Sequence, residues 1–230
     1  MSQQIPLALR LAHAPSLDDF VVGANQGVID ALTRSVAGNG ESVIFLSGAA
    51  GCGRTHLLLG QCAAAQQTGL RCAYVPLATH DQTAPEMLDG LETLDLIAID
   101  DVHAIAGVAA WEQALFNLFN RCRDRGTRLL FSADRGPAAL PLALPDLRSR
   151  LAWGLTLAVQ PLDDNGRLAL LKSLARRCAL KLPEEVARYL LERSPRHPTA
   201  LAGAIERLDR ASLAEQRPLT IPFVRDQLGL

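Results

Sequence analysis

The segment GAAGCGRT at residues 48–55 has the residue types and spacing to hold a polyphosphate. It follows the pattern G-x-x-x-x-G-K-[ST], with arginine in place of the lysine. The glycines let backbone N–H groups close around phosphate oxygens, the basic side chain reaches the terminal phosphate, and the threonine hydroxyl binds Mg²⁺. The sequence therefore predicts a nucleotide site formed by Gly48, Gly51, Gly53, Arg54 and Thr55, with Thr55 also on the metal.

Arg54 stands where this loop usually carries lysine, and two explanations remain open. The chain has 23 basic residues, of which only Lys172 and Lys181 are lysines, so a general preference for arginine explains the change without any effect on chemistry. Alternatively, a planar guanidinium fits a γ-phosphate transition state less well than a compact ammonium, while it still grips a diphosphate. Cys52, inside the loop, is either a small residue that fits there or a redox-sensitive thiol.

Acidic residues follow two predicted strands. Asp100 and Asp101 come at the end of an apolar run, and Asp134 follows the strand predicted at 128–132. Because the carboxyl ends of neighbouring parallel strands meet beside the phosphate loop, we expect Asp100 to hold Mg²⁺ and Asp101 to orient an attacking water. The alternatives are a polar turn for the pair and an Asx turn for Asp134.

Arg150 belongs to the segment LRSRLAWG at 147–154, which we expect to form a short exposed helix. A guanidinium there can act as an arginine finger on a nucleotide bound by another molecule. The alternative is a surface arginine that only solubilises the protein. Trp153 is expected to pack in the core or at an interface.

Strand and helix patterns alternate up to about residue 160. Short apolar runs bounded by turn residues predict buried strands, and apolar or amphipathic segments between them predict helices. The predicted strands are 42–48, 73–77, 94–100, 128–132 and 155–159, and the predicted helices are 55–67 and 111–123. This order predicts an α/β fold with a parallel sheet covered on both faces, and it puts the phosphate loop between a strand and a helix.

Beyond Pro161 the strand patterns stop. Helical patterns are predicted at 165–178, 184–193 and 201–213, followed by a short last segment. We therefore expect a tail at 1–15, a nucleotide-binding domain at 16–160 and a small all-helical domain at 161–230.

Composition narrows the class of protein. The net charge of -1 argues against a protein that coats nucleic acid, and the five cysteines, odd in number and never in C-x-x-C, indicate neither disulfides nor a zinc site. The N-terminal residues do not have the pattern of a signal peptide. No apolar run approaches the about 18 residues of a membrane span. We expect a cytoplasmic protein with no membrane segment and no direct nucleic-acid binding.

These residues, in this order, resemble the AAA+ domain of the DnaA family of bacterial replication initiators, and more closely its shortened Hda branch. The resemblance covers nearly the whole chain and implies a P-loop domain with a five-stranded parallel sheet, followed by a helical lid. It assigns an adenine-pocket segment at 20–25 with Val21 and Val22, a Walker A loop with Cys52 and His56, Walker B at Asp100 and Asp101, sensor 1 at Asp134 and the finger at Arg150.

The lid departs from the family pattern at one position. Aligned on LDRAS at 208–212, the sensor 2 arginine falls at Thr199. Arg196, three residues earlier, is the candidate to replace it, although Pro198 is expected to disturb the local geometry. Together with Arg54, this departure favours a protein that holds nucleotide over a vigorous ATPase.

The tail QIPLAL at 4–9 resembles the sliding-clamp-binding peptide of the Hda branch. Docked in an extended form, Leu7 and Leu9 would fill an apolar groove and Gln4 would hydrogen-bond at its edge. Ile5 and Ala8 depart from the family's residues. The chain stops at the lid, so we expect no origin-binding helix-turn-helix domain.

The resemblance implies a regulator of replication initiation. Such a protein binds ADP or ATP with Mg²⁺, attaches to the sliding clamp (the β subunit of DNA polymerase III) and stimulates ATP hydrolysis on DnaA. Nucleotide-dependent self-association is a further expectation. The alternatives are an autonomous AAA+ ATPase of the initiator or helicase-loader type, and an adaptor that has lost nucleotide binding.

Overall fold

The apolar runs of the first part of the chain form one parallel sheet. In the computed structural model, which describes residues 15–195 and 197–230, five strands lie in the order β2-β3-β4-β1-β5 and all neighbouring pairs are parallel. The strands are β1 (Val43–Ser47), β2 (Cys72–Pro76), β3 (Leu96–Asp100), β4 (Arg128–Ala133) and β5 (Leu155–Ala158). The five-stranded parallel sheet predicted from the sequence is confirmed.

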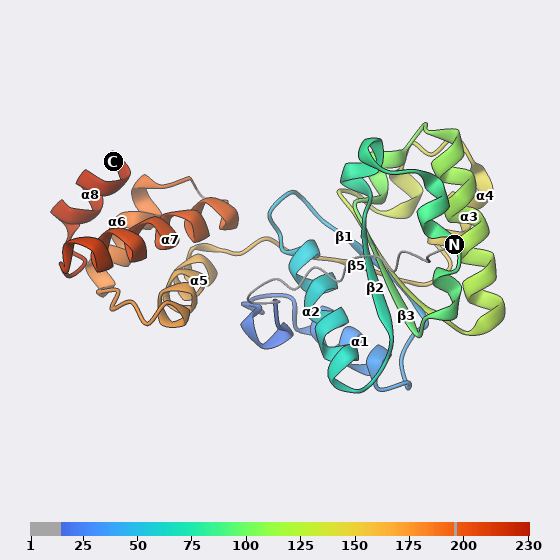
Figure 1. Cartoon of the computed structure of the whole chain (residues 1–230), viewed down its shortest axis with the longest axis horizontal. Coiled ribbons are helices and arrows are strands. Elements are labelled where there is room, and N and C mark those ends of the chain that lie inside the picture. Colours follow the sequence, from blue (N-terminus) through green and yellow to red (C-terminus); the bar gives the residue numbers. More distant parts are fainter. Residues whose placement is uncertain (1–14, 196) are drawn as a thin grey trace, which may run out of the picture.

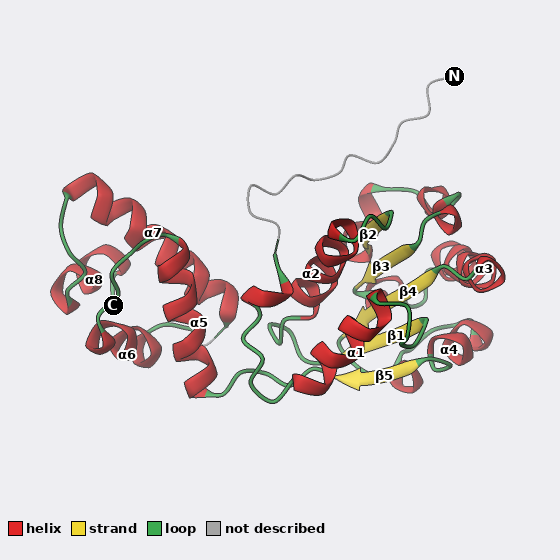
Figure 2. Cartoon of the chain, turned by 90° about the horizontal axis from the view of Figure 1, so that it is seen from below, coloured by secondary structure: helices red, strands yellow, loops and turns green. Residues whose placement is uncertain are grey.

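Helices cover both faces of this sheet (Figure 2). Along β1, Ile44 and Leu46 pack into one apolar cluster and Phe45 packs into another, as the alternating side chains of a strand require. The first cluster includes residues of α1 and α2, and the second includes residues of α3 and α4. The four elements are α1 (Gln26–Val36), α2 (Arg54–Gln67), α3 (Ala109–Arg125) and α4 (Pro145–Leu151).

A helical domain follows β5 and lies at one end of the molecule (Figure 1). It consists of α5 (Asp164–Arg177), α6 (Glu184–Arg193), α7 (Pro198–Glu215) and α8 (Ile221–Leu228). Leu171, Leu190, Ile205 and Phe223 belong to its core, a cluster distinct from the two beside the sheet. None of the helices in the described part of the chain is both long and apolar enough to cross a membrane.

The structure corrects the sequence-based reading of two segments. Helix α1 was not predicted at all. Helix α7 begins at Pro198 rather than at residue 201, with His197 as its N-cap. The expected disturbance by Pro198 is therefore wrong, because proline suits the first helical position, where no N–H needs a helical partner.

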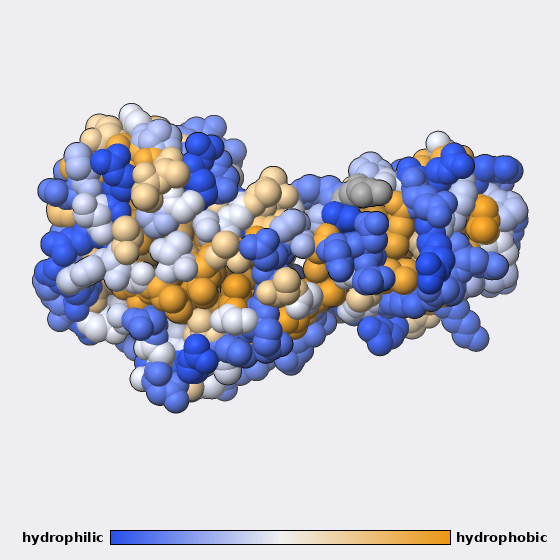
Figure 3. All heavy atoms as spheres, turned by 180° about the vertical axis from the view of Figure 1, so that it is seen from behind, coloured by the Kyte–Doolittle hydropathy of each residue, from blue (hydrophilic) through white to orange (hydrophobic). Residues whose placement is uncertain are grey.

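The connection to the helical domain is fixed to the sheet domain by Asn25. Its side chain is 2% exposed, donates to the carbonyl of Gln160 at 3.0 Å and accepts from the N–H of Gln160 at 2.7 Å. On the face seen in Figure 3, apolar side chains gather between the two domains, while polar side chains cover most of the outer helical domain. The start of the connection is therefore held to the sheet domain by these two hydrogen bonds. The helices that follow it also contact the sheet domain.

Glu112 of α3 is a buried carboxylate that fixes two loops. It is 1% exposed and accepts backbone N–H groups from Gly107 at 2.6 Å, Ala143 at 3.1 Å and Leu144 at 2.7 Å. Leu144 immediately precedes α4, so this carboxylate sets where α4 begins.

Replacing Glu112 with alanine should strongly destabilise the protein. The change leaves these N–H groups without their charged acceptor, and we expect the free energy of unfolding to fall by about 3 kcal/mol or more. Urea unfolding followed by circular dichroism measures this. Gln113→Ala, the exposed neighbour on the same helix, is the control and should change stability by less than about 0.5 kcal/mol. If Glu112→Ala lowered the free energy of unfolding as little as the control does, Glu112 would have no structural role.

Candidate nucleotide site

The phosphate loop joins β1 to the N-terminus of α2. Gly53 precedes this helix with a φ of 103°, a left-handed conformation that glycine adopts freely, and no side chain caps the helix. A Cβ at Gly53 would lie 2.7 Å from Cε2 of Phe20, so a larger residue has no room there. The N–H groups at the start of a helix attract anions through the helix dipole. The local geometry therefore suits a phosphate group.

Arg54 turns back across the loop. Its Nη1 donates to the carbonyl of Gly48, and its Nη2 donates to Oδ1 of Asp101 at 3.1 Å in an ion pair. The side chain is 10% exposed, and its Nε–H is buried without a hydrogen-bond partner among the residues that the structure describes. A buried N–H of this kind is costly to leave unpaired, and a phosphate oxygen would satisfy it.

Asp100, at the end of β3, accepts hydroxyl groups from three neighbouring elements. Thr55 of α2 and Tyr74 of β2 each donate to Oδ2 at 2.7 Å, and Ser132 of β4 donates to Oδ1. Burial and the adjacent carboxylate raise the pKa of Tyr74, so its phenol stays protonated and donates. The adjacent oxygens of Thr55 and Asp100 are of the type that Mg²⁺ prefers, which fits the expected metal site.

Asp101 and Asp134 lie at the same edge of the sheet but differ in their partners. Asp101 has a φ of 56°, its N–H donates to Ser132 Oγ at 3.0 Å, and its carboxylate faces Arg54. The carboxylate of Asp134 instead accepts from Arg135 at 2.9 and 2.7 Å, a pairing that lowers the pKa of Asp134. His103, which sequence reasoning did not single out, accepts the Asp134 N–H and lies 3.8 Å from Asp101.

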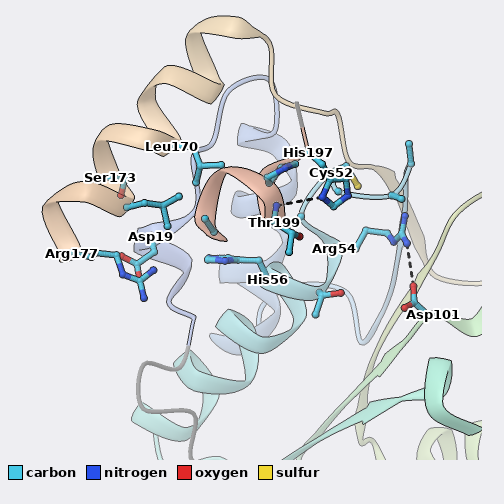
Figure 4. Close-up of a pocket in the computed structure, with 18 residues that line it drawn as sticks. Asp19, Cys52, Arg54, His56, Asp101, Leu170, Ser173, Arg177, His197 and Thr199 are labelled. Atoms are coloured by element: carbon cyan, nitrogen blue, oxygen red, sulfur yellow. Dashed lines mark hydrogen bonds and ion pairs between the residues drawn. The ribbon is translucent and has the colours of Figure 1, made fainter. Parts of the chain in front are cut away.

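A cavity of about 540 Å³ opens between the phosphate loop and the helical domain (Figure 4). Its volume falls within the range typical of small-molecule sites. From the sheet domain it is lined by Asp19, residues 49–56 and Asp101; from the helical domain it is lined by Leu170, Ser173, Leu174, Arg177, His197, Pro198, Thr199 and Ala202. Asp19 and Arg177 form an ion pair of 3.8 Å across the junction.

The structure brings most of the predicted nucleotide-binding residues to this cavity. The predicted residues that line it are Gly51, Cys52, Gly53, Arg54, Thr55, His56 and Thr199. Gly48 and Asp100 lie behind them, because Gly48 is hydrogen-bonded to Arg54 and Asp100 is hydrogen-bonded to Thr55. Val21 and Val22 are partly buried and do not line it, and neither does Asp134. Arg196 lies outside the described residues, as do Gln4, Leu7 and Leu9 of the tail.

Sequence reasoning missed the residues that the helical domain contributes, apart from Thr199. Leu170, Ser173, Leu174 and Arg177 follow the i, i+3, i+4, i+7 spacing of one helix face. That pattern indicates that the residues share a face of α5. It does not indicate that the face meets the phosphate loop.

Two titratable side chains of the loop region are neutral. Burial raises the pKa of the Cys52 thiol, which argues against the redox switch because the thiolate is the reactive form. Burial also lowers the pKa of His56. Its Nε2 lies 2.9 Å from the carbonyl of Ser16, and since a carbonyl only accepts, Nε2 carries the proton. His56 thereby fixes the start of the segment that includes Phe20.

Arg150 lies at the opposite edge of the sheet. It is in the last turn of α4, which leads into the amino end of β5, and it lies 5.2 Å from the ring of Trp153. That ring is 64% exposed and lines a small cavity of about 160 Å³ with residues that precede or begin β1 and β4. The phosphate loop instead follows the carboxyl end of β1. At roughly 3.3 Å per residue, the length of β1 separates the two edges by about 15 Å.

Two family models match the chain. The model of the bacterial DnaA ATPase domain matches residues 11–158, and the model of the Hda lid domain matches residues 164–228. Together the two matches span the sheet domain and the helical domain.

Solved structures are similar over most of the chain. Domain III of the Thermotoga maritima replication initiation protein DnaA is 24% identical, with 93% of this chain and 95% of that chain covered and a TM-score of 0.81. AMPPCP-bound DnaA from Aquifex aeolicus is 25% identical, with 87% and 66% covered and a TM-score of 0.71. The T. maritima RuvB branch migration motor, 17% identical with 94% and 71% covered and a TM-score of 0.71, shares the fold. The chain therefore belongs to the DnaA family of AAA+ proteins, and its helical domain is a lid of the Hda type.

Proposed function

We propose that this protein is a DnaA-related regulator of replication initiation that holds ADP between its sheet domain and lid and completes an ATP site on DnaA with Arg150. Membership of the DnaA family and the Hda-type lid support the regulatory class. The observation that carries the finer proposal is the position of Arg150, at the sheet edge away from the chain's own phosphate loop.

The nucleotide would lie in the cavity between the loop and the lid. Donors for phosphate oxygens would come from the N-terminus of α2 and from Nε of Arg54, which has no partner within the described residues. Val21 and Val22 belong to the segment proposed for the adenine. A DnaA relative was solved with AMPPCP bound, which supports an adenine nucleotide. Thr55 and Asp100 would hold Mg²⁺, which neutralises phosphate charge when bound.

The chain's own hydrolysis is proposed to be weak. Asp101, the candidate to orient an attacking water, is engaged by the guanidinium of Arg54 at 3.1 Å. A carboxylate in such a pair is a poorer acceptor for a water proton. Asp134, the sensor 1 candidate, is held by Arg135 and does not line the cavity. This arrangement favours holding a diphosphate over turning over a triphosphate.

Arg150 is proposed to act in trans. Among the described residues no carboxylate forms an ion pair with Arg150, and its recorded partner is the exposed ring of Trp153. Arg123 lies over the same ring at 5.8 Å, so two guanidinium groups stand on one exposed aromatic surface. Such a surface is complementary to an anionic site, and an arginine finger stabilises the charge that develops on a transferring phosphoryl group. The nucleotide site of DnaA would supply that anion.

The sliding clamp is the second proposed partner. The tail with Gln4, Leu7 and Leu9 would attach the protein to a clamp loaded on DNA and so raise its local concentration near DnaA. Nucleotide binding at the lid junction would also control self-association, which size-exclusion chromatography with and without ADP measures.

Arg54→Ala should weaken ADP binding by more than about tenfold, because it removes charge-assisted hydrogen bonds to phosphate. Isothermal titration calorimetry with Mg-ADP measures the dissociation constant, and Arg54→Lys, which keeps the charge, is the control. A wild-type protein that binds neither ADP nor ATP is instead an adaptor. Wild-type ATP turnover well above background, without DnaA or clamp, would support the autonomous ATPase.

Arg150→Ala should abolish the stimulation of ATP hydrolysis on DnaA. An arginine finger contributes about 1,000-fold or more to turnover. Phosphate release from ATP-bound DnaA, measured with clamp loaded on DNA, gives the rate. Arg148→Ala, on the same short helix, is the matched control and should keep most of the stimulation. Equal rates with wild-type protein and Arg150→Ala would refute the finger assignment.

Gln4→Ala should abolish co-elution with the sliding clamp, since it removes the hydrogen bond proposed at the edge of the clamp groove. Size-exclusion chromatography of the mixture measures the complex, and the ADP dissociation constant of the variant should equal that of wild type. Unchanged co-elution would exclude the tail as the clamp-binding segment.

A further inference from the structure

His197 of the lid lies against the phosphate loop. A Cβ at Gly51 would lie 2.5 Å from Nε2 and 2.7 Å from Cδ2 of His197, so the ring rests against the loop backbone. Gly51 has a φ of 78° and leaves room for this ring because it has no side chain. Figure 4 shows the ring between Thr199 and the loop, inside the cavity.

The hydrogen bond on the other side of the ring decides which nitrogen carries a proton. The N–H of Thr199 lies 3.4 Å from Nδ1 of His197. Because a backbone N–H only donates, Nδ1 accepts, and the neutral ring therefore carries its proton on Nε2. No acceptor for this Nε2–H is found within residues 15–195 and 197–230. A hydrogen-bond donor without a partner thus lies against the phosphate loop.

The site around this donor is suited to an anion. His197 is the N-cap of α7, an 18-residue helix whose positive dipole end is directed at the same cavity. The same cavity is lined by the N-terminus of α2 and by Arg54, whose buried Nε also lacks a partner in the described part of the chain. Thr199, at the sensor 2 position, already uses its backbone N–H on the ring. These donors converge from the loop and the lid.

We infer that His197 takes the phosphate-sensing place of the lid, donating from Nε2 to the terminal phosphate of a bound nucleoside diphosphate or triphosphate. The inference rests on the nucleotide binding proposed above and names the lid contact that depends on it. Through His197 the phosphate would join α7 to the loop, so that loss of the phosphate loosens the lid.

The test compares His197→Asn with wild type. Asparagine keeps an acceptor near Nδ1 that can cap α7, but its side chain ends before the position of Nε2. Displacement of a fluorescent ADP analogue should show ADP affinity about tenfold weaker in this variant, with AMP affinity unchanged. The melting temperature without nucleotide should also be unchanged. Thr199→Ala tests whether the hydroxyl of Thr199 makes the contact instead. Glu206→Ala, at an exposed position of α7 outside the cavity, is the control and should bind ADP as wild type does.

Each outcome separates the possibilities. Equal ADP affinity of His197→Asn and wild type would overturn the inference while leaving nucleotide binding intact. An equal loss of AMP and ADP affinity would also overturn it, because it would indicate a general structural effect. A loss confined to Thr199→Ala would assign the contact to Thr199 instead. A wild-type protein that binds no nucleotide would overturn the proposed function itself.

Discussion

The buried carboxylate of Asp100 is the constraint on which the site depends. A carboxylate that is 1% exposed must be surrounded by donors, since burial without them is costly. Asp100 meets this condition through hydroxyls of Thr55, Tyr74 and Ser132, which come from α2, β2 and β4. These bonds hold the helix after the phosphate loop to three adjacent strands. The edge of the sheet is therefore cross-linked by hydrogen bonds where a phosphate and its metal would lie.

Arg54 gains a physical meaning from its neighbours. Its guanidinium donates to the Gly48 carbonyl and to the Asp101 carboxylate, and its Nε–H has no partner among the residues that the structure describes. A lysine ammonium is a single nitrogen and could not span these positions from one side chain. The arrangement supports altered chemistry over a mere preference for arginine, because the residue opposes Asp101 as well as facing the cavity. It is consistent with a loop that retains nucleotide.

The two edges of the sheet are suited to different tasks. The carboxyl edge carries the proposed nucleotide site, a cavity that the lid also lines. The amino edge carries Arg150 on Trp153, positioned by α4, and the start of α4 is fixed in turn by the buried Glu112. Because the sheet lies between them, Arg150 cannot reach the chain's own loop without unfolding α4. A nucleotide at the proposed site could therefore influence Arg150 only through the sheet domain or through the geometry of a partner.

The sequence by itself determined the parallel sheet, the phosphate loop between a strand and a helix, and the helical lid, because each rests on local periodicity and short-range spacing. It did not reveal α1. It also directed attention to Thr199 and Arg196 in the lid, whereas His197 is the residue in contact with Gly51. Residues 51 and 197 are far apart in the chain, and their contact depends on how α5 and α7 pack beside the sheet domain. Only the tertiary structure could decide which lid side chain meets the phosphate loop, because no local pattern encodes that approach.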